Sequence, residues 1–171
     1  GKMATCTVRP GSAGGGAVKL TVSNQLTLNG TVSSDGATAT QSSAGSGGSV
    51  WITTKDSTGN GTITANGGNG TGGFNCPVGG GGGRIAYYYS GTNGFSGTLT
   101  ANPGTDDAGC YVAGTKGTVI IKDTTNNDIY IKNTQTWSAD PTREGAIQTF
   151  KNVYVQDNST LNLIGHYTSN V

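Results

Sequence analysis

The stretch Val50-Trp51-Ile52-Thr53-Thr54 has the β-branched and aromatic composition of a strand, and four further runs of this kind occur along the 171-residue chain. These four runs are Val18–Val22, Ile85–Tyr89, Val119–Asp123 and Val153–Asp157. The first residues of the five runs are separated by 32, 35, 34 and 34 positions. Such a period predicts a repeat architecture, because a linker has no reason to keep one.

A second, shorter strand-like segment follows each run. These segments are Leu26–Leu28, Thr62–Thr64, Thr98–Thr100, Ile129–Ile131 and Leu161–Leu163. Turn residues such as those of Ser57–Gly61 connect the two segments, and a long Gly-rich excursion such as Asn66–Gly83 leads to the next repeat. One repeat is therefore expected to contain a strand, a turn, a strand and a long loop.

Alternation within the first run predicts which side chains are buried. Across the five repeats, position one is Val, Val, Ile, Val and Val, position three is Leu, Ile, Tyr, Ile and Val, and position two varies widely. Positions one and three are therefore expected to point inward, and position two outward. Tyr87 and Tyr89 are expected to point inward as well.

We therefore predict an all-β fold, a parallel β-helix (solenoid) of about five repeats of ~34 residues with long Gly-rich loops. The single domain would span residues 1–171, with repeats starting near positions 18, 50, 85, 119 and 153. A β-sandwich of short strands is the alternative, although its strands are usually joined by tight hairpins at closer spacing.

The composition agrees with a turn-rich β protein and excludes several function classes. Gly, Thr, Asn and Ser supply 87 of the 171 residues, whereas hydrophobic residues supply only 32%. These four residue types are mediocre or poor helix formers. With a formal net charge of +1 there is no basic excess to attract nucleic acid, and no apolar stretch is long enough to span a membrane.

Two of the three cysteines occupy the same position in consecutive repeats. Cys76 lies nine residues before Ile85, and Cys110 lies nine residues before Val119. Stacked equivalent residues are ~4.8 Å apart, which suits a disulfide and predicts a Cys76–Cys110 bond and an oxidising, extracellular location. Two free thiols are the alternative. Cys6 is out of register, and is either free or paired outside the chain.

Four Asn-x-Ser/Thr sites also occur along the chain, at Asn29, Asn60, Asn69 and Asn158. A chain this rich in Asn and Thr produces such triplets by chance, so they carry little weight.

Two segments, Gly47–Gly68 and Gly79–Ser90, resemble the glycine-rich repeats of very large secreted and cell-surface proteins of bacteria. The resemblance covers roughly residues 45 to 133. It implies a β-helical fold and an adhesin-like or structural role at the cell surface. It carries no catalytic residues.

The residues that chemistry would need are sparse. His166 is the one histidine, and a lone histidine cannot build a zinc site, so neither a metal nor a cofactor is expected. Carboxylates that could serve a β-helical hydrolase or lyase occur as Asp106-Asp107, as Asp123 with Asp128, and as Asp140 with Arg143 and Glu144. Such acidic groups more often mark solvated turns, and the chain is not expected to be an enzyme.

Three aromatic side chains are expected on outward positions: Trp51, Tyr88 and Tyr154. Exposed aromatics on a rigid sheet can stack on sugar rings or contact a partner, unless the Gly-rich loops cover them. The expected function is structural or adhesive, either as a subunit of a self-assembling surface filament or as a module of a larger surface protein. A carbohydrate-binding module that uses these aromatics is the alternative.

Self-association is the partner that the repeats favour. A solenoid exposes unpaired strand edges at its ends, and no helix pattern that could cap them is evident. The strand near Val18 is expected to meet the strand near Val153 of a neighbouring copy in a head-to-tail assembly.

Overall fold

The structure, a computed structural model, describes residues 10–72, 77–106, 114–133, 135–138 and 149–164. These residues form an all-β fold in which most strand pairs are parallel. The strands are β1 (Ala17–Thr27), β2 (Thr31–Ser33), β3 (Ala39–Thr40), β4 (Ser49–Gly59), β5 (Thr62–Thr64), β6 (Gly70–Thr71), β7 (Arg84–Tyr89), β8 (Asn93–Phe95), β9 (Thr98–Thr100), β10 (Thr118–Asp123), β11 (Asp128–Ile131), β12 (Gln135–Ser138), β13 (Asn152–Val155) and β14 (Leu161–Ile164).

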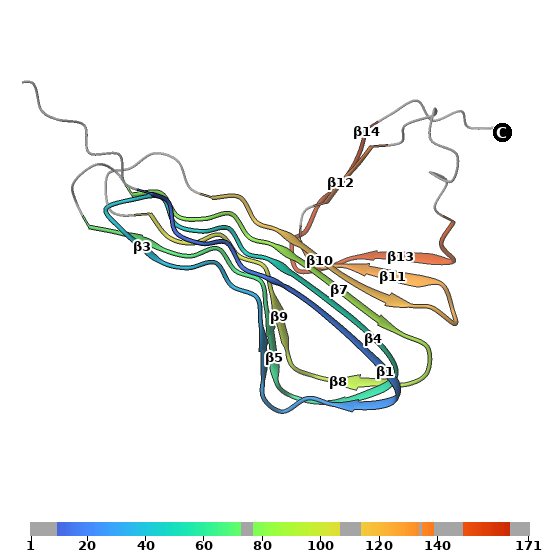
Figure 1. The fold of residues 1–171 in the computed structure, drawn as a ribbon. Coiled ribbons are helices and arrows are strands. Elements are labelled where there is room, and N and C mark those ends of the chain that lie inside the picture. The colour runs from blue at the N-terminus through green and yellow to red at the C-terminus, as the bar shows by residue number, and fades with distance from the viewer. Residues whose placement is uncertain (1–9, 73–76, 107–113, 134, 139–148, 165–171) are drawn as a thin grey trace, which may run out of the picture.

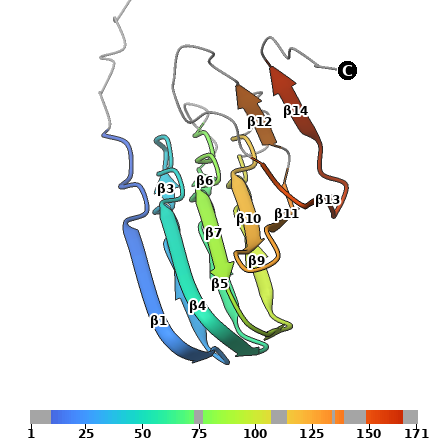
Figure 2. The ribbon, with the colours of Figure 1, turned by 90° about the vertical axis from the view of Figure 1, so that its right-hand side faces the viewer.

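The strands form three sheets, here called A, B and C, and one separate pair (Figure 1). Sheet A has the order β1-β4-β7-β10-β11-β13, with β8 beside the end of β4. Sheet B has the order β2-β5-β9, sheet C consists of β3 and β6, and β12 pairs with β14. The chain visits sheets A, B and C in turn and then returns beside its own earlier path. Figure 2 shows β1, β4, β7 and β10 side by side, with β5 and β9 behind them.

In these parallel pairs, residues at equivalent positions of successive sequence repeats lie beside each other. Val18 pairs with Val50, Val50 with Ile85, and Ile85 with Val119. The predicted second strands Thr62–Thr64 and Thr98–Thr100 are β5 and β9, and they pair in parallel within sheet B. Parallel pairing of this extent does not fit the sandwich alternative.

The predicted side-chain facing is confirmed in the second, third and fourth repeats. Both inward positions of β4, β7 and β10 are buried, as is Tyr89. Trp51, between the two inward positions of β4, is 45% exposed. In the core, Tyr87 stacks on Phe95 of β8 with ring centroids 5.8 Å apart.

The stacking ends earlier than the sequence repeat does. β11 turns back and pairs antiparallel with β10, and β13 then pairs in parallel with β11. The expectation that Ile129–Ile131 continues sheet B is therefore wrong, as is inward burial of Val153 and Val155, which are 43% and 45% exposed. The reversal has a local cause: the β10–β11 connection is a tight turn in which Asn127 has a φ of 57°.

The reversal also creates a second buried region. Ile129 and Ile131 are buried, and they lie opposite Lys122 and Ile120 in the antiparallel ladder. Residues directly opposite each other share a sheet face, so these two isoleucines lie on the face of sheet A that points away from the main core.

A third correction concerns Leu26–Leu28, which is no separate strand, because β1 runs on to Thr27 and sheet B begins with β2.

The Gly-rich excursions, expected as loops, are closely packed where the structure describes them. The N–H groups of Gly48, Gly83 and Gly117 donate across the molecule to the carbonyls of Ser34, Ala65 and Ala101, at 2.7, 2.7 and 2.8 Å. We call one passage of the chain through sheets A, B and C a turn of the fold. The two opposite sides of each such turn are therefore joined by a backbone-to-backbone hydrogen bond. Ala65 and Ala101 are fully buried beneath this contact.

Glycine is required here because backbone surrounds it. Gly16, Gly48, Gly83 and Gly117 form a column that we call the glycine ladder. A Cβ on any of the last three would collide with the carbonyl oxygen of the preceding glycine in the ladder. No described atom lies within 4 Å of such a Cβ on Gly16, the first member.

We therefore expect Gly83→Ala to destabilise the fold by ~3 kcal/mol or more, because the clash is with backbone that cannot rotate away. Gly16→Ala, the matched control at the open end of the ladder, should change the free energy of unfolding by less than ~0.5 kcal/mol when the protein is monomeric. Urea unfolding followed by circular dichroism measures both. Equal effects of the two substitutions would contradict the packing described for the ladder.

Candidate binding face

The outer face of sheet A presents side chains in cross-strand rows. Because inward residues alternate with outward ones, the register defines three outward rows. They are Ala17–Ser49–Arg84–Thr118, Lys19–Trp51–Ala86–Ile120 and Thr21–Thr53–Tyr88–Lys122. These rows bring together two of the three aromatic residues that the sequence singled out.

Trp51 and Tyr88 form an edge-to-face pair, with ring centroids 6.0 Å apart and an interplanar angle of 72°. Lys19 places its Nζ 4.8 Å from the centroid of the Trp51 ring. Such aromatic and cation–π contacts restrain the indole while leaving Trp51 45% exposed. The cross-strand neighbour of Trp51 on β7 is the small Ala86, so the contact from that strand comes from Tyr88, two residues farther along.

Tyr154 lies elsewhere. It stacks on Tyr130, with ring centroids 4.7 Å apart and planes inclined by 10°. Tyr154 is the cross-strand partner of Tyr130, and Tyr130 is the partner of Ile121, which is on the core side of sheet A. Tyr154 is 41% exposed, but the structure does not bring it to the face that carries Trp51 and Tyr88.

A hollow of about 410 Å³ adjoins these rows, where the chain enters β4, β7 and β10. Its lining comes from three successive turns, through Ser46–Ser49, Gly82–Arg84 and Lys116–Thr118. Arg84 and Lys116 are its two charged residues, and both are exposed. Among the residues that the structure describes, neither of these two side chains has an ion pair or a hydrogen bond. The sequence alone does not reveal this hollow, because Gly-rich segments have the composition of loops.

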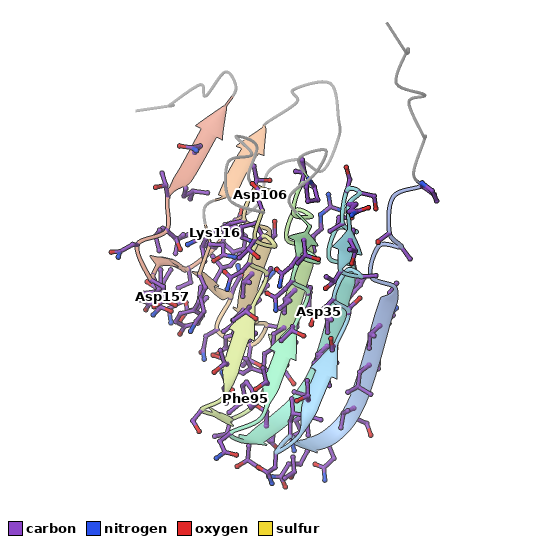
Figure 3. The ribbon with its side chains drawn as sticks, turned by 90° about the vertical axis from the view of Figure 1, so that its left-hand side faces the viewer. Asp35, Phe95, Asp106, Lys116 and Asp157 are labelled. Atoms are coloured by element: carbon purple, nitrogen blue, oxygen red, sulfur yellow. The ribbon has the colours of Figure 1, made fainter. Side chains whose placement is uncertain are left out.

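Several polar side chains, among them the catalytic candidate Asp106, have structural roles between turns. Asp35 accepts hydrogen bonds from the Ser33 and Thr64 hydroxyls and from the Asn66 backbone N–H, at 2.9, 3.0 and 2.6 Å. Asn66 in turn accepts from the backbone N–H of Asn102, at 2.8 Å. Asp106 likewise accepts from the backbone N–H of Gly79. Figure 3 shows Asp35 beside sheet B and Asp106 farther along, beyond β9. These Asp and Asn side chains tie one turn to the next.

Asp123 is buried in the β10–β11 turn. Its carboxylate accepts hydrogen bonds from the backbone N–H groups of Thr125 and Asn126, both at 2.9 Å, and from the Asn126 side chain at 2.8 Å. Burial alone would raise the pKa of this carboxyl, but these bonds, together with the charge of Lys151, outweigh it and lower the pKa below its ordinary value. The Asp123–Asp128 pair is therefore part of the turn.

The catalytic and metal candidates remain without support. In the part of the chain that the structure covers, no three His, Cys, Asp or Glu side chains gather closely enough to hold a metal ion. Asp107, Asp140, Arg143, Glu144 and His166 lie outside the described residues, as do Cys6, Cys76 and Cys110, so the disulfide stays a prediction. Within the described ranges, no helix is long and apolar enough to cross a membrane.

Comparison of the chain with protein-family models, with curated proteins and with solved structures finds no match. No relative therefore supplies a function for this face.

The Asp123 turn makes stability depend on pH. Because the carboxyl has a lower pKa in the folded than in the unfolded chain, its contribution is present above the unfolded pKa of about 3.9 and is lost as the pH falls through the folded pKa. Asp123→Asn should cost ~1–2 kcal/mol at pH 7 and flatten the pH dependence of unfolding below about pH 5.

The control for this turn is Asn126→Ala, which removes one of the three hydrogen bonds to Asp123 and should give a smaller loss. Urea unfolding at a series of pH values from 3 to 7 measures both variants. A slope below pH 5 that is the same for the wild type and Asp123→Asn would show that another group is responsible.

Proposed function

We propose that this chain is a structural module of an extracellular surface assembly, a parallel β-helix whose first turn receives a further turn of the same kind. One observation carries the proposal: three sheet edges lie together at the first turn, because β1, β2 and β3 are each the terminal strand of their sheet. No strand of the described ranges pairs with their outer edges. Unpaired strand edges are ready-made surfaces for strand addition.

The apolar column inside the turns supports this proposal. Val50, Ile52 and Ile63 are fully buried, whereas their first-turn equivalents Val18, Leu20 and Val32 are only half-buried. The column therefore reaches the first turn and stays partly open to solvent there. Another turn placed on it would bury these side chains, which is favourable at ~25 cal/mol per Å² of apolar surface.

Glycine positions point the same way. Gly61 and Gly97 follow Gly30 in a second column, in which a Cβ would again collide with the carbonyl of the preceding glycine. Both columns begin at a glycine, Gly16 or Gly30, with no described atom within 4 Å of its Cβ position. Glycine carries an entropic cost on folding, so its presence at these two open positions suits a turn stacked beyond them.

The edge of β1 also has the right polarity. The N–H of Ser49 donates to the carbonyl of Gly16 at 3.0 Å. Strand alternation then directs the backbone groups of Val18 and Leu20 toward β4, and those of Lys19 and Thr21 away from it. A second copy of this chain could therefore add a strand at Lys19 and Thr21. The small net charge offers little repulsion.

The far end differs from the expectation of a uniform stack. β13 runs antiparallel to β1, β4, β7 and β10, so a head-to-tail contact between the Val18 and Val153 strands would pair them antiparallel. We therefore centre the proposed self-association on the first turn. The extracellular location rests on the predicted disulfide and on the resemblance to surface-protein repeats.

The test uses substitutions that act only on the open edge. Thr21→Pro removes an N–H that points away from β4, so it should leave the monomer folded and abolish association. The Gly16→Ala/Gly30→Ala double variant should do the same by blocking the incoming backbone. Sedimentation velocity over a wide concentration range measures association, with Thr21→Ala as the matched control. A wild-type protein that stays monomeric throughout would refute self-stacking at the first turn.

A further inference from the structure

The hollow at the entry to β4, β7 and β10 has the chemistry of an anion site. Arg84 and Lys116 are its charged residues, and none of its lining residues is acidic. The described ion pairs, Lys55–Asp56 and Lys132–Asp157, involve neither of them. Two cationic residues whose side chains have no described carboxylate partner therefore line one surface depression. A guanidinium in particular matches a carboxylate or sulfate through two parallel hydrogen bonds.

The rest of the lining suits a hydroxyl-rich ligand that approaches closely. Glycines make up half of it, and their N–H groups are already committed: Gly83 and Gly117 donate across the molecule, and Gly82 donates to Thr115. The glycine part of the lining therefore carries neither side chains nor free N–H groups. Ser46, Ser49 and Thr118 contribute hydroxyl-bearing residues to the lining. A volume of about 410 Å³ lies within the range of small-ligand sites.

The hollow continues onto the aromatic pair. Ser49 is the cross-strand neighbour of Arg84, and Trp51 is the next outward residue along β4. From strand spacing and rise, the Cα atoms of Arg84 and Trp51 are about 8 Å apart on the same face. This distance is comparable to the length of one or two sugar rings. Arg84 and Trp51 can therefore contact neighbouring units of one chain.

Carbohydrate fits these features better than nucleic acid does. Four described cations, Lys19, Arg84, Lys116 and Lys122, lie along this side of the molecule, too few for the many phosphate contacts that support nucleic-acid binding. Sugar rings instead present apolar C–H faces to an indole and hydroxyls to serine and threonine. The positive charge selects acidic sugars over neutral ones.

We propose that the outer face of sheet A binds an acidic polysaccharide, with Arg84 and Lys116 on a carboxylate and Trp51 stacked on an adjacent ring. This function is separate from stacking at the first turn, because the outer face of a sheet and its edge are different surfaces. In an assembly, the face would recur with every copy, and weak single sites would add up.

The experiment measures binding of polygalacturonate to the full chain by isothermal titration calorimetry, with dextran as the neutral polymer. Arg84→Gln and Lys116→Gln should each weaken binding about tenfold or more, since each removes a charged hydrogen-bond donor. Trp51→Ala should weaken it by about five- to tenfold. Lys151→Gln, which removes the same charge away from the hollow, should change the affinity less than about twofold. Dextran should not bind measurably.

Four outcomes would overturn the proposal. Equal losses for Arg84→Gln and Lys151→Gln would mean non-specific charge attraction, and an unchanged affinity of Trp51→Ala would remove the stacked ring. Tighter binding of a single-stranded oligonucleotide than of polygalacturonate would make the face a nucleic-acid site. Failure of the folded wild type to bind polygalacturonate would refute the site outright. The Thr21→Pro variant should bind as the wild type does, so this result is independent of self-association.

Discussion

Backbone hydrogen bonds that cross the molecule at the glycine ladder are the constraint on which the fold depends. Each turn is closed by one such bond, from Gly48, Gly83 or Gly117 to the opposite side, while the carbonyls of Gly48 and Gly83 accept from the next turn. A side chain at these positions would push the turns apart. The ladder thereby sets how closely turns stack, and hence the register of sheets A and B.

The apolar core is a consequence of this close stacking. Only one side of each turn, around Val50, Ile52 and Ile63, is filled by side chains, and the other side is filled by backbone. A chain with 32% hydrophobic residues can therefore still bury its interior. The Asp35–Asn66–Asn102 series then ties the turns together at a corner, where the core cannot reach.

The repeat period and the alternation within strands predicted the strands, their parallel register and the buried faces of β4, β7 and β10. They did so because β-branched residues at alternate positions are typical of a strand that buries one of its two faces. The same signals could not reveal the reversal at β11, since Ile129–Ile131 has the pattern of any buried strand. The decisive residues are in the turn, where Asp123 binds the backbone of Thr125 and Asn126. The alternation also predicted the outward facing of Trp51 and Tyr88, but not their contact with each other. The hollow beside Arg84 and Lys116 depends on the packed glycines, which composition alone does not distinguish from loops.

An interior made largely of backbone also has a thermodynamic consequence. Unfolding would expose less apolar and more polar surface than in a domain with an ordinary core, and polar exposure lowers the heat-capacity change on unfolding. A small heat-capacity change flattens the curve of stability against temperature. The packed glycine layer therefore favours a protein whose stability varies little between cold and warm surroundings.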